Sequence, residues 1–136
     1  MTSQLELALE LSAAHAAAHE RLGAKVEWYG PLDGEYYRIG RKGVIGVMGD
    51  YVHTFVHPDD IVRGSRDAVR LYQRLLDEGR RVIFPVYYLN FRSIIGIKKL
   101  GSTLLGVDED NFFHYELKAI MPREQRKELL RGKEGT

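Results

Sequence analysis

A strand–helix–strand succession over residues 51–88 limits the fold of this chain more than any other feature of its sequence. Residues 51–57 and 82–88 are rich in Val, Ile, Phe and Tyr, which favour strands. Residues 59–78 carry apolar side chains at helical spacing, and Gly79 follows as a stop signal. Because parallel neighbours need a crossover connection, the intervening helix predicts that the two strands run parallel and diverge at their C-terminal ends.

The first segment, residues 3–22, predicts a helix. It is rich in Ala, Leu and Glu, and Gly23 stands where a C-cap is expected. Its apolar residues cover much of the helix surface, so we expect them to pack on the sheet or on a partner chain. They are Leu5, Ala8, Leu9, Leu11, Ala16 and Leu22.

The whole chain then reads as α-βββ-α-β-α-ββ, which predicts an α+β fold with a mixed central sheet flanked by helices. Turn residues such as Gly, Asp and Asn separate the successive runs. The remaining expected elements are strands at about 35–40 and 43–48, a short helix at 91–100, strands at 103–107 and 112–118, and a polar helix at 123–131.

Length and composition predict one domain and exclude several functions. The chain has 136 residues, so we expect one domain with an N-terminal helix in 1–23, a core in 35–118 and a polar helix and tail in 122–136. A net charge of +1 supplies no overall field for nucleic acid, and the absence of cysteine excludes a thiolate nucleophile. Neither a signal peptide nor an apolar run of about 20 residues is found, so a soluble protein without a membrane span is expected.

Two stretches after the second helix carry a family resemblance. The first is the run Asn90-Phe91-Arg92-Ser93 through Lys98-Lys99-Leu100-Gly101. The second is the hairpin formed by Leu105-Gly106-Val107 and Phe113-His114-Tyr115-Glu116-Leu117. Together they are similar to the closing motifs of GNAT (Gcn5-related N-acetyltransferase) proteins. From about Tyr51 to Leu117 the chain resembles the acetyl-CoA-binding half of that fold. The resemblance implies that the fourth and fifth strands splay to admit a pantetheine arm, which suits Pro85, a residue without a ladder donor. It also implies acetyl-CoA or CoA as cofactor, with Val56, Asn90 and Arg92 among its contacts.

The phosphate-binding motif of the family has an altered counterpart here. In the family, Gln/Arg-x-x-Gly-x-Gly/Ala places backbone N–H groups at a helix N-terminus around the pyrophosphate. The matching run is Arg63-Gly64-Ser65-Arg66-Asp67-Ala68. Arg66 replaces the middle glycine and Asp67 adds a negative charge. Two outcomes stay open: Arg66 blocks the site, or its guanidinium binds phosphate itself.

The catalytic positions of the family are altered as well. The resemblance implies a base on the fourth strand, near His53, and a tyrosine acid at the position of Ile97, which cannot donate a proton. Tyr87 or Tyr88 would then replace the acid. All three candidates also have a structural interpretation, because His53, Tyr87 and Tyr88 lie on predicted strands, where tyrosine is common and a lone histidine is more often structural than catalytic.

Other polar patterns predict structural roles. His15 and His19 are spaced i, i+4 on the first helix, but no third ligand is evident, so no metal site is expected. Asn90 is expected to cap the short helix that Arg92 begins. Four arginines of the second helix share it with acidic residues, which favours a solvated face. They are Arg63, Arg66, Arg70 and Arg74.

Three functions follow from these patterns. The chain resembles the small GNAT-like proteins of tailed bacteriophages, of the internal virion protein type, which implies an accessory role with virion or host proteins as partners, in the virion or the host cytoplasm. The first alternative is an active acetyl-CoA-dependent N-acetyltransferase with an amine acceptor. The second is a plain protein-interaction module that uses the Ala-rich N-terminal helix. The sequence names no acceptor, host or oligomeric state.

Overall fold

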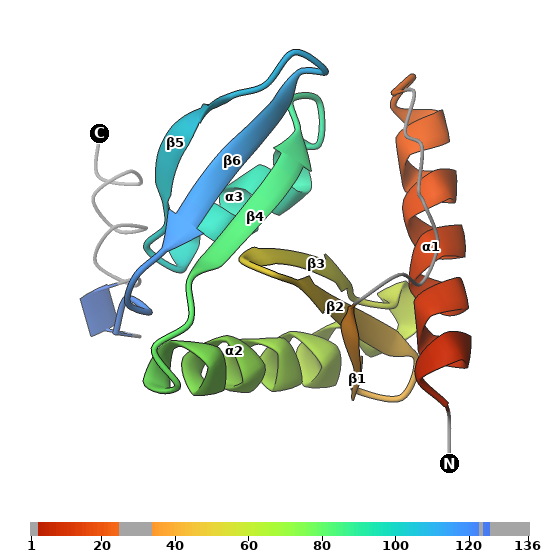
Figure 1. The fold of residues 1–136 in the computed structure, drawn as a ribbon, viewed down its shortest axis with the longest axis horizontal. Coiled ribbons are helices and arrows are strands. Elements are labelled where there is room, and N and C mark those ends of the chain that lie inside the picture. The colour runs from red at the N-terminus through yellow and green to blue at the C-terminus, as the bar shows by residue number, and fades with distance from the viewer. Residues whose placement is uncertain (1–2, 25–33, 123, 126–136) are drawn as a thin grey trace.

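A six-stranded mixed sheet with helices on both faces forms the architecture of the chain (Figure 1). The structure, a computed structural model, describes residues 3–24, 34–122 and 124–125. In chain order the elements are α1 (Gln4–Arg21), β1 (Glu35–Ile39), β2 (Gly43–Met48), β3 (Tyr51–Phe55), the 3₁₀ turn η1 (Pro58–Asp60), α2 (Ile61–Asp77), β4 (Val82–Tyr87), α3 (Phe91–Lys99), β5 (Thr103–Val107) and β6 (Phe112–Leu117).

The predicted α+β class and element order are confirmed up to residue 118, with ends that differ by a few residues. The second predicted helix, 59–78, is divided into η1 and α2, because Pro58 at its start leads into a 3₁₀ turn. The polar helix predicted at 123–131 falls outside the described residues, except for residues 124 and 125.

The parallel pairing of β3 and β4 positions the rest of the molecule. The strands are ordered β1-β2-β3-β4-β6-β5, and every pair except β3–β4 is antiparallel. β3 and β4 share a single register pair, Tyr51 with Ile83, and they separate beyond it in Figure 1. Pro85 lies past this pair and faces His114 of β6, so its missing donor costs no bond to β3. The predicted parallel, diverging strands are therefore confirmed.

The two faces of the sheet carry different cores. Alternate residues of each strand point to opposite faces, and α2 and α3 cover one face while α1 covers the other over β1 to β3. The main core lies on the α2 side and includes Val52, Phe84 and Tyr115 from the strands. A smaller core on the α1 side comprises Leu7, Ala8, Leu11, Tyr36 and Val44, with Phe55 packed against it.

Helix α1 packs on the sheet, which is one of the two arrangements that the sequence predicts, the other being packing on a partner chain. Only part of its apolar surface is buried there. Leu11 is fully buried, whereas Leu5 and Leu9 are 57% and 55% exposed. These two leucines were expected to pack along with the others. They lie on the solvent side because α1 meets the sheet along a single face.

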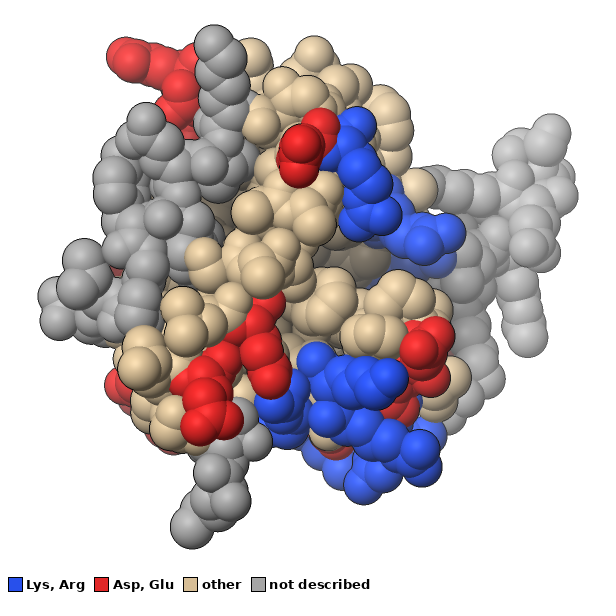
Figure 2. Space-filling model, turned by 90° about the vertical axis from the view of Figure 1, so that its right-hand side faces the viewer, with Lys and Arg blue, Asp and Glu red and all other residues tan. Residues whose placement is uncertain are grey.

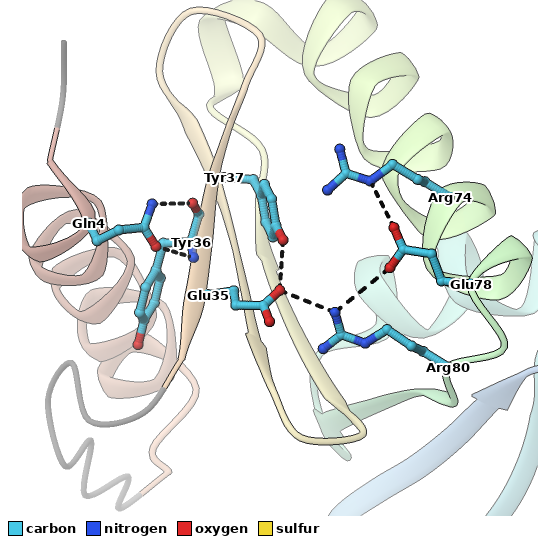
Figure 3. Close-up of polar contacts among 7 residues, drawn as sticks. All are labelled: Gln4, Glu35, Tyr36, Tyr37, Arg74, Glu78 and Arg80. Carbon is cyan, nitrogen blue, oxygen red and sulfur yellow. Dashed lines mark hydrogen bonds and ion pairs between the residues drawn. The ribbon is translucent and has the colours of Figure 1, made fainter.

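A glutamine side chain covers part of the sheet edge at β1 (Figure 3). The Tyr36 N–H donates to Gln4 Oε1 and Gln4 Nε2 donates to the Tyr36 carbonyl oxygen, both at 2.7 Å. The amide of Gln4 thus supplies the donor and acceptor that a neighbouring strand would supply. This contact fixes the N-terminal end of α1 against β1.

Candidate functional site

Helix α2 begins before the predicted phosphate-binding run, so the run lies inside the helix. Its first residue is Ile61, after η1, and the Asp60 N–H donates to the His57 carbonyl oxygen at 3.0 Å. Only the N–H groups of the first turn lie outside the intrahelical pattern. From residue 64 onward, backbone N–H groups point to carbonyl oxygens of the preceding turn.

Gly64 serves close packing between α2 and the chain that follows β3. It is buried, and a Cβ atom placed there would lie 3.1 Å from Cγ1 of Val56. Ala68 is buried in the main core one turn later, whereas Ser65 is exposed. The small residues of the run thus allow the helix to approach the sheet.

Two carboxylates near the start of α2 hold the turn between β1 and β2. Asp60 Oδ2 accepts the Arg41 N–H at 2.6 Å, and Asp67 Oδ2 accepts the Gly40 N–H at 2.7 Å. Asp60, at the N-cap of α2, also lies where the helix dipole favours a carboxylate, whereas Asp67 lies beyond the first turn. These two carboxylates therefore place negative charge near the start of α2, where the resemblance implies that a diphosphate binds.

Arg63 and Arg66 come together beside an open hollow of about 400 Å³. Both side chains are exposed. Figure 2, which looks onto the side that carries α1, shows basic and acidic side chains interleaved on its lower part. The residues that line the hollow are Pro58, Asp59, Asp60, Ile61, Val62, Arg63 and Arg66.

The other basic residues of α2 form a solvated, ion-paired face, as predicted. Arg70 lies 3.9 Å from Asp67, and Arg74 lies 3.5 Å from Glu78 and over the ring of Tyr37. The side chains of Arg70 and Arg74 are 74% and 56% exposed. Figure 3 shows Arg74 in a chain of contacts that continues through Glu78 to neighbouring elements.

His53 joins the two histidines of α1 in a cluster at the opening between β3 and β4. The ring centroid of His15 lies 5.5 Å from that of His19 and 5.5 Å from that of His53. Burial, with a further contribution from the charge of His19, lowers the pKa of His53 to about 4. Burial, followed by the charges of His53 and His19, lowers the pKa of His15 to about 3. We call His15, His19 and His53 the histidine cluster.

The other end of the cluster contacts β4 and β6. His19 is 8% exposed, and its Nδ1 donates to the His15 carbonyl oxygen at 2.7 Å. Its ring lies 6.3 Å from that of Tyr87 and 5.6 Å from that of Phe112. Tyr87 is buried, and the adjacent Tyr88 is 40% exposed. Helix α1 therefore bridges the two diverging strands through one histidine on each side.

Sequence reasoning did not find that His15 and His19 meet His53 and Tyr87. The i, i+4 spacing of His15 and His19 indicated a shared helix face, but not its neighbours. Among the described residues no group of three or more His, Cys, Asp or Glu is placed to hold a metal ion. The histidine cluster is a set of packed imidazole rings, in which burial favours the neutral form of His15 and His53 by lowering their pKa values.

The residues expected at the start of the short helix lie at the C-terminal end of β4. The Ser93 N–H donates to Asn90 Oδ1 at 3.4 Å, which confirms the predicted N-cap of α3. Arg92 is exposed in the first turn. Ile97 is half-buried and packs against the main core.

Comparisons with known proteins add no relative. No protein-family model matches the chain, and neither the curated proteins nor the solved structures contain a match to it. Within the part of the chain that the structure describes, no helix combines the length and the apolar character needed to cross a bilayer.

Proposed function

We propose that the chain is a GNAT-like scaffold protein of the phage accessory type, which acts through contacts with other proteins and not through acyl transfer. The strand order and the single parallel pair of β3 and β4 support the GNAT-like part of this proposal. The phage-type part rests on the sequence resemblance described above. Since function resides in a site and not in a fold, the residues at the opening between β3 and β4 decide which function the fold can carry.

The packing of α1 across that opening carries the proposal. His15 contacts His53 on β3, and His19 contacts Tyr87 on β4. His53, the nominated base, and Tyr87, one of the two nominated acids, are thus packed against a helix, whereas Tyr88 is 40% exposed. An imidazole with a pKa of about 4 is also a weak proton acceptor, because an effective general base titrates near the working pH.

The residues at the start of α2 do not fit a backbone cradle for the pyrophosphate of CoA. The Arg63–Ala68 run lies inside the helix, Gly64 packs against Val56, and the nearby carboxylates of Asp60 and Asp67 hold the β1–β2 turn. A cradle needs free N–H groups at the phosphate. They are lacking over residues 64–68, because this part of the run lies beyond the first turn of α2.

Calorimetric titration of the native chain with acetyl-CoA tests the proposal, with thermal unfolding in the same ligand as a second measurement. We expect no binding heat and no rise in Tm at ligand concentrations up to about 1 mM, a range that detects even weak sites. Binding with a Kd in the micromolar range would contradict the proposal.

A second candidate function, acetyl-CoA-dependent N-acetyl transfer, is favoured by the hollow beside Arg63 and Arg66. Two guanidinium groups can hold phosphate by charge-assisted hydrogen bonds without a backbone cradle. The test is release of free CoA thiol from acetyl-CoA in the presence of a polyamine or a lysine peptide. Amine-dependent release by the native chain would replace the scaffold proposal with this one.

A further inference from the structure

Strand β5 forms one edge of the six-stranded sheet, on the side away from β1 (Figure 1). All five of its residues are exposed, and Leu104, Leu105 and Val107 are each more than half exposed. Among the residues that the structure describes, only β6 pairs with β5. The open side of β5 is therefore accessible to a further strand.

The two edges of the sheet differ in how they are protected. At β1, the Gln4 amide bonds the Tyr36 backbone and the Asp67 carboxylate accepts the Gly40 N–H. Charged side chains and covering groups of this kind keep an edge from pairing with another chain. Strand β5 has the sequence Thr-Leu-Leu-Gly-Val, which contains neither a charge nor a proline. It therefore resembles an edge that accepts a strand.

A β-bulge lies in the middle of β5. The register passes from Leu104 opposite Tyr115 to Gly106 opposite His114, so Leu105 is the extra residue and has no partner on β6. A strand on the open side of β5 would cover its exposed side chain.

The segments on either side of β5 carry opposite charges. Helix α3 follows β4 and ends just before β5, so Lys98 and Lys99 lie near the start of β5, whereas Arg92 lies near β4. Glu109 and Asp110 follow the end of β5 in the turn to β6. We call Lys98 and Lys99 the basic end and Glu109 and Asp110 the acidic end. Within the described part of the chain none of these four exposed side chains has an ion-pair partner.

This polarity identifies the partner strand as β5 of a second copy in the antiparallel direction. With the two-fold axis at Leu105, residues 109 and 110 of one copy are level with residues 101 and 100 of the other. The acidic end of each copy then faces the basic end of the other, twice in the dimer. A parallel pair would instead bring like charges together, which is unfavourable.

We propose that two copies of this chain pair their β5 strands antiparallel about a two-fold axis and so form one continuous sheet. The proposal goes beyond the proposed function, because it holds whether or not the chain binds CoA.

The side chains of β5 fit this register. Leu104 of one copy lies opposite Gly106 of the other, and a Cβ atom placed at Gly106 would have nothing within 4 Å in the single chain. The large side chain of Leu104 thus meets a residue that leaves room for it. The two copies of Leu104 are also diagonal neighbours, which stabilises a strand pair.

Other charged groups beside β5 leave the polarity in place. Arg81 bonds Glu116 of β6 through two contacts of 3.0 Å, and His114 bonds Asp108 at 2.9 Å. These carboxylates are therefore already used within one chain. Lys118, which follows β6 beside the start of β5, adds to the positive charge of the basic end.

The small contact sets the expected strength. Five residues at about 3.4 Å each give a strand of roughly 17 Å. Such a contact is smaller than the standard protein–protein interface, and the bulge interrupts its ladder of hydrogen bonds. A weak dimer in rapid equilibrium with monomer is therefore expected.

Analytical ultracentrifugation of the full chain at concentrations up to about 1 mM tests the dimer. We expect the weight-average mass of the native chain to rise from the monomer toward the dimer value. Leu105→Lys should stay monomeric, because its two ammonium groups would meet at the axis. A lysine is common on edge strands, so the fold should persist, which circular dichroism checks. The matched control is Leu9→Lys on α1, where the leucine is 55% exposed.

The control should dimerise like the native chain. A native chain that stays monomeric at every concentration overturns the proposal, and so does a Leu105→Lys variant that dimerises as the native chain does. A monomeric Leu9→Lys also overturns it, because α1 lies over β1 to β3, at the other end of the sheet from β5.

Charge reversal tests the orientation. One double variant, Lys98→Glu with Lys99→Glu, has two acidic ends, and a second, Glu109→Lys with Asp110→Lys, has two basic ends. Each should dimerise at least about tenfold more weakly than the native chain, because several weak ion pairs are replaced by repulsion. An equimolar mixture should recover dimerisation, since every facing pair of ends is again complementary.

High salt should weaken the native dimer and relieve the repulsion in each double variant. If both double variants dimerise as tightly as the native chain, the ends do not face one another and the antiparallel arrangement is refuted. A mixture that dimerises no better than its components refutes it as well.

Discussion

The rings of His15 on α1 and His53 on β3 lie with their centroids 5.5 Å apart and their planes at 70° to each other. Burial is the main cause of the lowered pKa of both residues, to about 3 for His15 and about 4 for His53. Both values lie below 6.5, the ordinary value of histidine, so the folded chain favours the neutral imidazoles and the unfolded chain binds more protons. The resulting stability is complete above pH 6.5 and is lost as the pH falls toward 4 and below.

We therefore expect the Tm to fall between about pH 7 and about pH 5, with a loss of free energy of unfolding on the order of 2 kcal/mol. His53→Phe keeps a ring in the cluster but cannot be protonated, so its Tm should depend less on pH. His57→Asn, at the N-cap of η1, is the control and should keep the native dependence. Thermal melts at several pH values measure the Tm of the native chain and of both variants. An unchanged slope in His53→Phe would show that the cluster does not control acid stability.

Gly40 and Gly49 have the same backbone conformation in different surroundings. Their φ angles are +57° and +61°, but a Cβ at Gly40 would overlap with Asp60 Oδ2, whereas nothing lies within 4 Å of one at Gly49. Both alanine variants suffer the left-handed backbone, which costs about 1–2 kcal/mol. Gly40→Ala should cost about 2 kcal/mol more, because it also displaces the carboxylate that accepts the Arg41 N–H. Urea unfolding measures both, and equal losses would contradict the contact between this turn and α2.

The Gln4 amide should protect the edge of the sheet at β1. Gln4→Ala removes both bonds to the Tyr36 backbone and should lower the free energy of unfolding by about 1 kcal/mol. It should also speed hydrogen exchange of the Tyr36 N–H, a readout that loss of helix stability alone would not single out. Gln73→Ala is the control, since the Gln73 amide bonds Asp77 on the exposed side of α2. Unaltered exchange at Tyr36 would show that the two hydrogen bonds between Gln4 and the Tyr36 backbone do not persist in solution.

Asn90 should act chiefly as a helix cap. Asn90→Ala should lower the free energy of unfolding by about 1 kcal/mol, whereas Asn90→Asp should preserve the cap. Denaturant unfolding compares the two variants. If Asn90→Ala keeps full stability and yet loses binding of a ligand, Asn90 belongs to a binding site instead.

Arg66 separates the two candidate functions. Its N–H lies inside α2, so Arg66→Gly exposes no new donor and costs the helix about 1 kcal/mol. We expect neither the native chain nor Arg66→Gly to bind acetyl-CoA in calorimetric titration. Binding that is weaker in Arg66→Gly than in the native chain would make Arg66 a phosphate ligand and favour the acetyltransferase. Tighter binding by the variant would show that Arg66 blocks a usable site.

The sequence alone determined the succession of elements and the parallel pair at its centre. Apolar periodicity, glycine stops and turn residues determine local structure over a few residues of the chain, so they can be recognised without a structure. The Asn90 cap is of the same kind, because its partner is the N–H of Ser93 three residues later. The crossover helix then required parallel strands on topological grounds.

Tertiary packing alone decided what those elements present to one another. His15 and His19 share a helix face by their spacing, but their contacts with His53 and Tyr87 depend on how α1 crosses β3 and β4. The spacing of Gly64 in a phosphate motif likewise could not reveal Val56 as its neighbour. Such contacts join residues far apart in the chain, and their energies depend on burial and close approach, which no local pattern encodes.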